Sequence, residues 1–210
     1  MSIPPPPEVK PQTEQASRYQ YPNYMLRRKM LKLFGGRIDI YDPNGNPVMC
    51  CLQKAFKLKE DIRLYTDDSK ANELLTIKAR NIIDFSAAYD VTDAQTGEVV
   101  GTLRRKGWKS LVRDAWEILD PAGSPIATIQ EDNIWLSLLR RFESIGWLFP
   151  QAFHFATPEG LDLARARQQF NPFIHKMDLF MPDARQSAIV DPRLVLAAST
   201  LLVLIEGRQR

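Results

Sequence analysis

The chain has 210 residues, and its 28 lysines and arginines against 25 acids leave a formal charge of +3, too small to indicate nucleic-acid binding without a clustered patch. Its hydrophobic fraction of 44% and charged fraction of 25% are ordinary for a globular protein that can bury a core. The two cysteines, Cys50 and Cys51, are neighbours that point to opposite faces of a strand, which excludes a disulfide framework and favours a reducing compartment.

The first 22 residues are expected to form a disordered leader. They begin without a signal-peptide pattern, carry the prolines Pro4–Pro7, and continue into a polar segment that ends at Tyr21 and Pro22. Such a segment buries too little apolar surface to offset its ordering cost. A solvated tail and a polyproline II ligand for a partner domain both fit this composition. A single domain is expected to occupy residues 23–210.

Four hairpins are predicted between residues 37 and 131. Each consists of two stretches with period-two alternation that flank a turn rich in Asp, Gly, Asn or Pro, which is the sequence pattern of a β-hairpin. The predicted turns are 42–45, 67–69, 95–97 and 120–123. Four hairpins in series indicate an antiparallel meander that must close or stack to protect its edges.

The next segment changes period. Apolar residues recur at helical spacing from Ile134 to Ile145, with Asp132 or Asn133 as a cap, which predicts an amphipathic helix over 132–147. Three further strands are expected around 153–155, 161–165 and 173–181.

The chain then reaches an uncharged run of twelve residues, Leu194–Ile205. Asp191 as N-cap, Pro192 at the first helical position and Gly207 after the end predict a helix over 192–206. Such a run is about 18 Å long as a helix, against about 30 Å of bilayer hydrocarbon. A helix with no polar face that is too short to span a membrane is expected to be enclosed by protein. Ser199 and Thr200 can return their hydroxyls to the preceding turn and need not prevent burial.

Several segments, in this order along the chain, resemble the LURP-one-related proteins, which group with phospholipid scramblases and the tubby C-terminal domain. The likeness covers residues 24–210 and rests on residues 24–30, the hairpin 38–48 with its Asp-Pro-Asn-Gly-Asn turn, and segments 54–63, 129–133, 169–173, 191–197 and 205–209. It implies a mainly β fold, a closed antiparallel barrel of about twelve strands that encloses the hydrophobic C-terminal helix. The four hairpins, a strand at Tyr24–Met30 and the three later strands give the same number.

The residues favour a non-catalytic protein. Only His154 and His175 are available as histidines, neither near a second metal ligand, and no P-loop, G-x-S-x-G or G-x-G-x-x-G motif occurs. His154, between Phe153 and Phe155, is expected to be an outward strand residue. No cofactor and no metal are expected. The segment 181–191 holds only two acids where scramblases carry a calcium-binding stretch, which argues against calcium-activated scrambling.

Two basic clusters are the candidate sites. Arg104, Arg105 and Lys106 are followed by Trp108 and Lys109, and the earlier cluster is Arg27, Arg28 and Lys29. Cations attract anionic headgroups, and a tryptophan suits a membrane interface. The phosphoinositide binding of tubby domains supports the same interpretation by analogy. The alternative is an ordinary solvated strand surface. Residues 26–34 also fit a basic amphipathic helix, whereas the resemblance implies a first barrel strand.

The leading hypothesis is therefore a barrel that binds anionic phospholipid or phosphoinositide headgroups, or a protein partner, through its outer surface. A scramblase-like protein anchored by its C-terminal segment is the first alternative, and an enzyme or small-ligand carrier is the second. The protein is expected in the cytoplasm, with peripheral association to a membrane surface. No nucleic-acid partner is expected, and the oligomeric state stays open.

Overall fold

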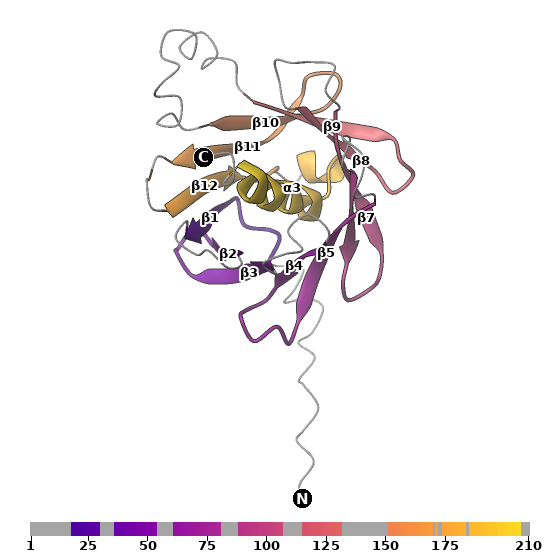
Figure 1. Cartoon of the computed structure of the whole chain (residues 1–210). Helices are drawn as coiled ribbons and strands as arrows, with labels where there is room; N and C mark the ends of the chain where they lie inside the picture. The colour runs from indigo at the N-terminus through magenta and orange to yellow at the C-terminus, as the bar shows by residue number, and fades with distance from the viewer. Residues whose placement is uncertain are drawn as a thin grey trace, which may run out of the picture.

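The computed structural model describes residues 18–29, 36–53, 61–80, 88–106, 115–131, 151–169, 171, 174–183 and 185–206. Within these ranges, twelve antiparallel strands close into a barrel around one C-terminal helix, α3 (Pro192–Glu206), as Figure 1 shows. This confirms the expected fold class. The amphipathic helix expected at 132–147 and residues 1–17 of the leader lie outside the described residues.

Every strand pairs with the next one in the chain, and β1 pairs with β12 to close the barrel. The four predicted hairpins are confirmed as β2–β3, β4–β5, β6–β7 and β8–β9. The strands are β1 (Asn23–Lys29), β2 (Gly36–Tyr41), β3 (Pro47–Gln53), β4 (Asp61–Tyr65), β5 (Glu73–Ala79), β6 (Ala88–Asp93), β7 (Val99–Arg105), β8 (Ala115–Leu119), β9 (Pro125–Glu131), β10 (Ala152–Ala156), β11 (Asp162–Gln169) and β12 (Ile174–Phe180).

The strands alternate between the barrel interior and the outer surface. In β4, Ile62 and Leu64 are fully buried, whereas the alternating residues Asp61, Arg63 and Tyr65 are partly exposed. This alternation follows from the pleat of a strand, which sends successive side chains to opposite faces. The same period therefore decides which members of a charged run reach the outer surface.

Helix α3 fills the barrel interior. Every side chain from Leu194 to Leu204 is buried, with at most 3% of its surface exposed. The N-terminus is capped as the sequence predicts, because the backbone N–H of Arg193 donates to Asp191 Oδ1 at 2.8 Å. A helix that is apolar all round is stable here because strands surround it on all sides.

The two hydroxyls in the middle of α3 are bonded within the helix. Ser199 Oγ donates to the Val195 carbonyl and Thr200 Oγ1 donates to the Leu196 carbonyl, both at 2.9 Å. This confirms the expectation that each hydroxyl donates to a backbone carbonyl of the preceding helical turn. The barrel interior therefore accommodates these two polar groups without further partners.

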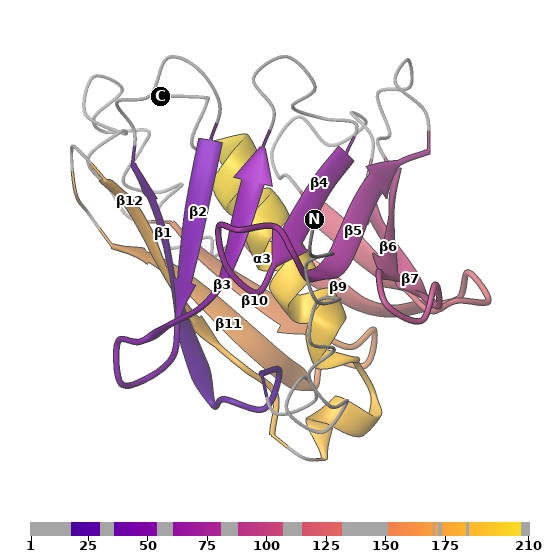
Figure 2. The ribbon, with the colours of Figure 1, turned by 90° about the horizontal axis from the view of Figure 1, so that it is seen from below.

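The barrel has two different ends (Figure 2). The end that we call the turn end carries the turns 42–46, 66–72, 94–98, 120–124 and 157–161, together with the start of α3. The opposite, far end carries the last residues of β1 and β7 and the first residues of β12. Helix α3 runs from the turn end to the far end.

Residues 18–22, which the sequence assigns to the leader, pack onto the turn end. Tyr19 and Tyr21 contact the core cluster, and the ring of Tyr21 meets that of Tyr24 edge-on at 5.7 Å between centroids. The Pro22 carbonyl accepts a hydrogen bond from the Met181 backbone N–H at 2.9 Å, which extends the β1–β12 pairing. These five residues therefore belong to the packed barrel.

Candidate functional site

Charged residues are divided between the two ends of the barrel. The turns and the segment before α3 are mainly acidic, with Lys70 and Arg185 as bases and Asp42, Asp67, Asp68, Glu98, Asp120, Glu159, Asp183 and Asp191 as acids. Residues within three positions of the far strand ends, or just beyond them, are mainly basic. The bases are Arg27, Arg28, Arg37, Arg63, Lys78, Arg80, Arg104, Arg105, Lys106, Arg167 and Lys176, and the acids are Asp39, Asp61, Asp90, Glu117 and Glu131. Among the described residues, basic side chains therefore outnumber acidic ones at the far end, although Arg37 and Arg63 there also pair with Asp68 and Glu73.

The β7 cluster meets a carboxylate on the neighbouring strand. Arg104 Nη2 lies 2.6 Å from Glu117 Oε2, and Lys106 Nζ lies 2.7 Å from Glu117 Oε1. Burial raises the pKa of the Glu117 carboxyl, but the hydrogen bonds from Lys106 and Arg104 outweigh burial and hold this pKa below its ordinary value. One negative charge is therefore shared by two cations, and a net positive charge remains on this outer face.

Arg105 does not join its two neighbours. It lies opposite the buried Trp116 in the β7–β8 register, whereas Arg104 lies opposite Glu117 on the other face. Trp108 and Lys109, the other members of the predicted cluster, lie outside the described residues. In the described part of this cluster, the outer surface carries Arg104 and Lys106.

The β1 cluster is divided in the same way. Residues 23–29 form a strand, so the alternative of a basic amphipathic helix is wrong for them. Arg28 faces inward, where Nη1 donates to the Val203 and Leu204 carbonyls at 3.3 Å each. A cation at the C-terminal end of a helix is favourable because the last carbonyls have no partner within the helix.

Arg27 faces outward and has a neighbour that the sequence analysis does not single out. Lys176 of β12 lies directly opposite Arg27 in the β1–β12 register. For Lys29 the structure describes the backbone only. Thus Arg27 and Lys176, rather than three consecutive residues, make the basic surface at this seam of the barrel.

The two histidines lie on opposite faces of the wall. His154 faces outward, as predicted, with Nδ1 3.9 Å from Asp162 Oδ1, and His175 is buried on the inward face of β12. In the part of the chain that the structure describes, no group of three or more His, Cys, Asp or Glu is arranged to hold a metal ion.

Both cysteines are buried free thiols. Burial raises the pKa of Cys50 to about 11 and that of Cys51 to about 12. At neutral pH both thiols are therefore protonated, and thiolate chemistry is not favoured at either position.

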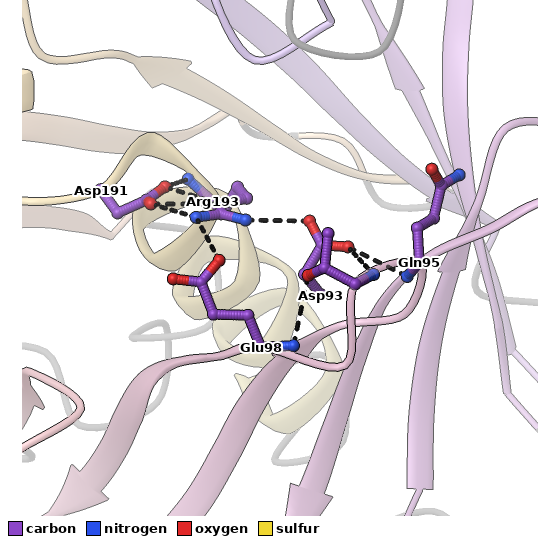
Figure 3. A network of polar contacts seen from close by, with 6 residues as sticks. Asp93, Gln95, Glu98, Asp191 and Arg193 are labelled. Atoms are coloured by element: carbon purple, nitrogen blue, oxygen red, sulfur yellow. Dashed lines mark hydrogen bonds and ion pairs between the residues drawn. The ribbon is translucent and has the colours of Figure 1, made fainter. Parts of the chain in front are cut away.

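A polar network at the turn end holds the start of α3 in place (Figure 3). Arg193 bridges Asp191 at 2.7 Å and Asp93 at 2.8 Å, and it lies 3.8 Å from Glu98 in the β6–β7 turn. Asp93 also accepts the backbone N–H groups of Gln95 and Thr96. Every group that Figure 3 labels belongs to the helix start or to this turn, so the network has a structural role.

Comparison with known proteins identifies the family. Among the described residues, no helix is both long enough and apolar enough to cross a membrane. A comparison with curated proteins returns no match. A comparison with protein families matches residues 50–198 to the family described as LURP-one-related. That match covers more than half of the chain and most of the barrel, and the protein belongs to the LURP-one-related family.

Proposed function

We propose that this protein is a non-catalytic, tubby-like barrel that binds anionic phospholipid through its far end, as a peripheral protein of a cytoplasmic membrane surface. The separation of charge along the barrel carries this proposal. Cations gather at the far strand ends, whereas the turns at the other end are acidic. An anionic surface attracts each nearby Lys or Arg by about 1 kcal/mol, and repulsion of the acidic end favours one orientation.

The filled interior supports an outer site. Eleven consecutive residues of α3, Leu194–Leu204, occupy the space where a barrel protein would otherwise enclose a ligand. The same burial argues against the C-terminal segment as an anchor, because a helix surrounded by strands does not contact lipid in this fold. The phosphoinositide binding of tubby domains adds support by analogy.

Vesicle co-sedimentation tests the proposal. Vesicles of phosphatidylcholine with phosphatidylserine should retain the protein, vesicles of phosphatidylcholine alone should not, and added salt should release it because salt screens exposed charges. Replacing Arg104 and Lys106 by glutamine should weaken retention, whereas the same change at Lys70 and Arg185 of the turn end should not. Retention on neutral vesicles, or on none, would contradict the proposal.

Glu117→Gln is expected to strengthen vesicle binding. Glu117 neutralises one of the two cations that it contacts, so its replacement leaves both Arg104 and Lys106 free to attract lipid. The gain corresponds to about one charge, or about fivefold in affinity. Glu131→Gln removes the same charge from the end of β9 and serves as the matched control, with a smaller expected gain because β9 is not a neighbour of β7 in the barrel. Unchanged affinity of Glu117→Gln would contradict a role for this face.

A further inference from the structure

Two like charges face each other across the seam that closes the barrel. Arg27 of β1 and Lys176 of β12 are direct cross-strand partners, and both lie on the outward-facing register. Like charges directly opposite each other on neighbouring strands destabilise a sheet. In the described part of the chain, neither side chain has an acidic partner within 4.0 Å, so no ion pair offsets this repulsion directly.

The nearest carboxylates are engaged elsewhere. Asp39 lies opposite Arg27 on the β2 side, but its Oδ1 accepts a hydrogen bond from Arg37 Nε at 2.5 Å. Asp178, two residues beyond Lys176 in β12, accepts from the Gln169 side-chain amide at 2.6 Å. Both acids therefore already have a donor, and neither forms an ion pair with Arg27 or Lys176 within 4.0 Å.

The guanidinium of Arg27 also lacks an acceptor. Its Nε is buried and has no hydrogen-bond partner among the described residues. Most buried N–H groups in proteins are bonded, and an unmade bond of a charged donor is costly. Arg27 as a whole is partly exposed, so an incoming anion would contact the exposed part of its side chain and place negative charge beside this unbonded donor.

We infer that Arg27 and Lys176 form a phosphate-binding site on the outer surface of the β1–β12 seam, an inference that rests on the proposed function and gives it a second contact point. Cross-strand partners hold their Cβ atoms about 5 Å apart, so a guanidinium and an ammonium can contact different oxygens of one phosphate group. A phosphomonoester fits best because its charge near −2 matches two cations. Its source is a lipid headgroup or a soluble phosphate compound.

The test compares two double variants with equal loss of charge. Arg27→Gln with Lys176→Gln removes the site, and Lys78→Gln with Lys106→Gln removes two cations from β5 and from the end of β7. On phosphatidylcholine vesicles that contain a phosphoinositide with monoester phosphates, the first pair should weaken binding at least about tenfold, since it removes two charge-assisted contacts. The second pair should weaken it less. On phosphatidylserine vesicles the two double variants should lose the same amount of binding affinity.

A soluble arm separates the site from membrane binding. Inositol trisphosphate should raise the Tm of the wild type, because a ligand that binds the native state stabilises it, and should leave the Tm of the Arg27–Lys176 variant unchanged. Without ligand and at low salt, that variant should melt no lower than the wild type, since it loses a repulsion. If both double variants lose the same affinity for phosphoinositide vesicles, and inositol trisphosphate does not change the Tm of the wild type, the site is overturned while the proposed function stands. If the wild type binds none of the anionic vesicles, the proposed function is overturned. The Tm shift with inositol trisphosphate then tests the phosphate site by itself.

Discussion

Gly101→Ala is expected to destabilise the protein by about 3 kcal/mol or more, measured by urea denaturation. A Cβ at this position would lie 2.4 Å from the Leu119 carbonyl oxygen and 2.9 Å from Leu194 Cδ1. The first atom belongs to the backbone of β8 and cannot rotate away, and the second belongs to the first buried turn of α3. The glycine thus permits the close approach of the barrel wall to the helix.

Gly123→Ala is the matched control. Gly123 adopts φ +88° in the β8–β9 turn, and its Cβ would meet no atom within 4 Å. This substitution should cost only about 1 kcal/mol, from the left-handed backbone conformation alone. A Gly101→Ala protein as stable as the Gly123→Ala protein would contradict the packing of α3 against β7.

Arg193→Ala is expected to cost about 2–3 kcal/mol, because it leaves two poorly exposed carboxylates without their shared cation. The side chains of Arg193 and Asp93 are only 21% and 16% exposed. Arg193→Lys should recover part of this loss, since it restores the charge but not the planar fork that reaches Asp191 and Asp93 together. Arg165→Ala, which removes a surface pair with Asp162, should change stability by less than about 0.5 kcal/mol.

The cost of Arg193→Ala should depend on pH with a defined sign. Burial raises the pKa of Asp93, but the N–H groups of Thr96 and Gln95 and the contact with Arg193 outweigh burial and lower this pKa below its ordinary 3.8. A carboxyl with a lowered folded-state pKa stabilises the native state at neutral pH, and this contribution is lost as pH falls through the folded pKa. The difference in free energy of unfolding between wild type and variant should therefore shrink below about pH 4. A gap that widens on acidification would contradict the pairing.

The fold could be predicted because its signals are local. Period-two alternation and turns such as Asp120–Gly123 specify hairpins over a few residues, and consecutive hairpins pair in order. The helix was predictable from Asp191, Pro192 and an apolar run with no polar face. Closure followed because an open meander would expose two strand edges.

The surface was harder to predict because consecutive charged residues in a strand point to opposite faces and do not form one patch. Arg104 and Lys106 reach the outer face, but Arg105 between them lies on the other face, opposite Trp116. Arg28 contacts the end of α3 instead of solvent. The alternation of side chains along a strand, applied to the basic clusters as it was to the apolar residues, would have predicted which of these residues face outward.

The contacts between distant strands were beyond the sequence. Arg27 and Lys176 meet only because the first and last strands close the barrel in one register. The pairing of Glu117 with the β7 cations likewise depends on the β7–β8 register. Since a slip of one residue would reverse every side chain, neither contact follows from spacing along the chain.

The most direct test of the account is which end of the barrel faces an anionic membrane. Gln130 and Ala122 are exposed residues of the β8–β9 hairpin, the first at the far end and the second in the turn, and both native thiols are buried. A fluorophore on a cysteine at position 130 should be quenched by headgroup-labelled phosphatidylserine vesicles, whereas one at position 122 should not. Stronger quenching at 122, or equal quenching at both positions, would contradict binding through the far end.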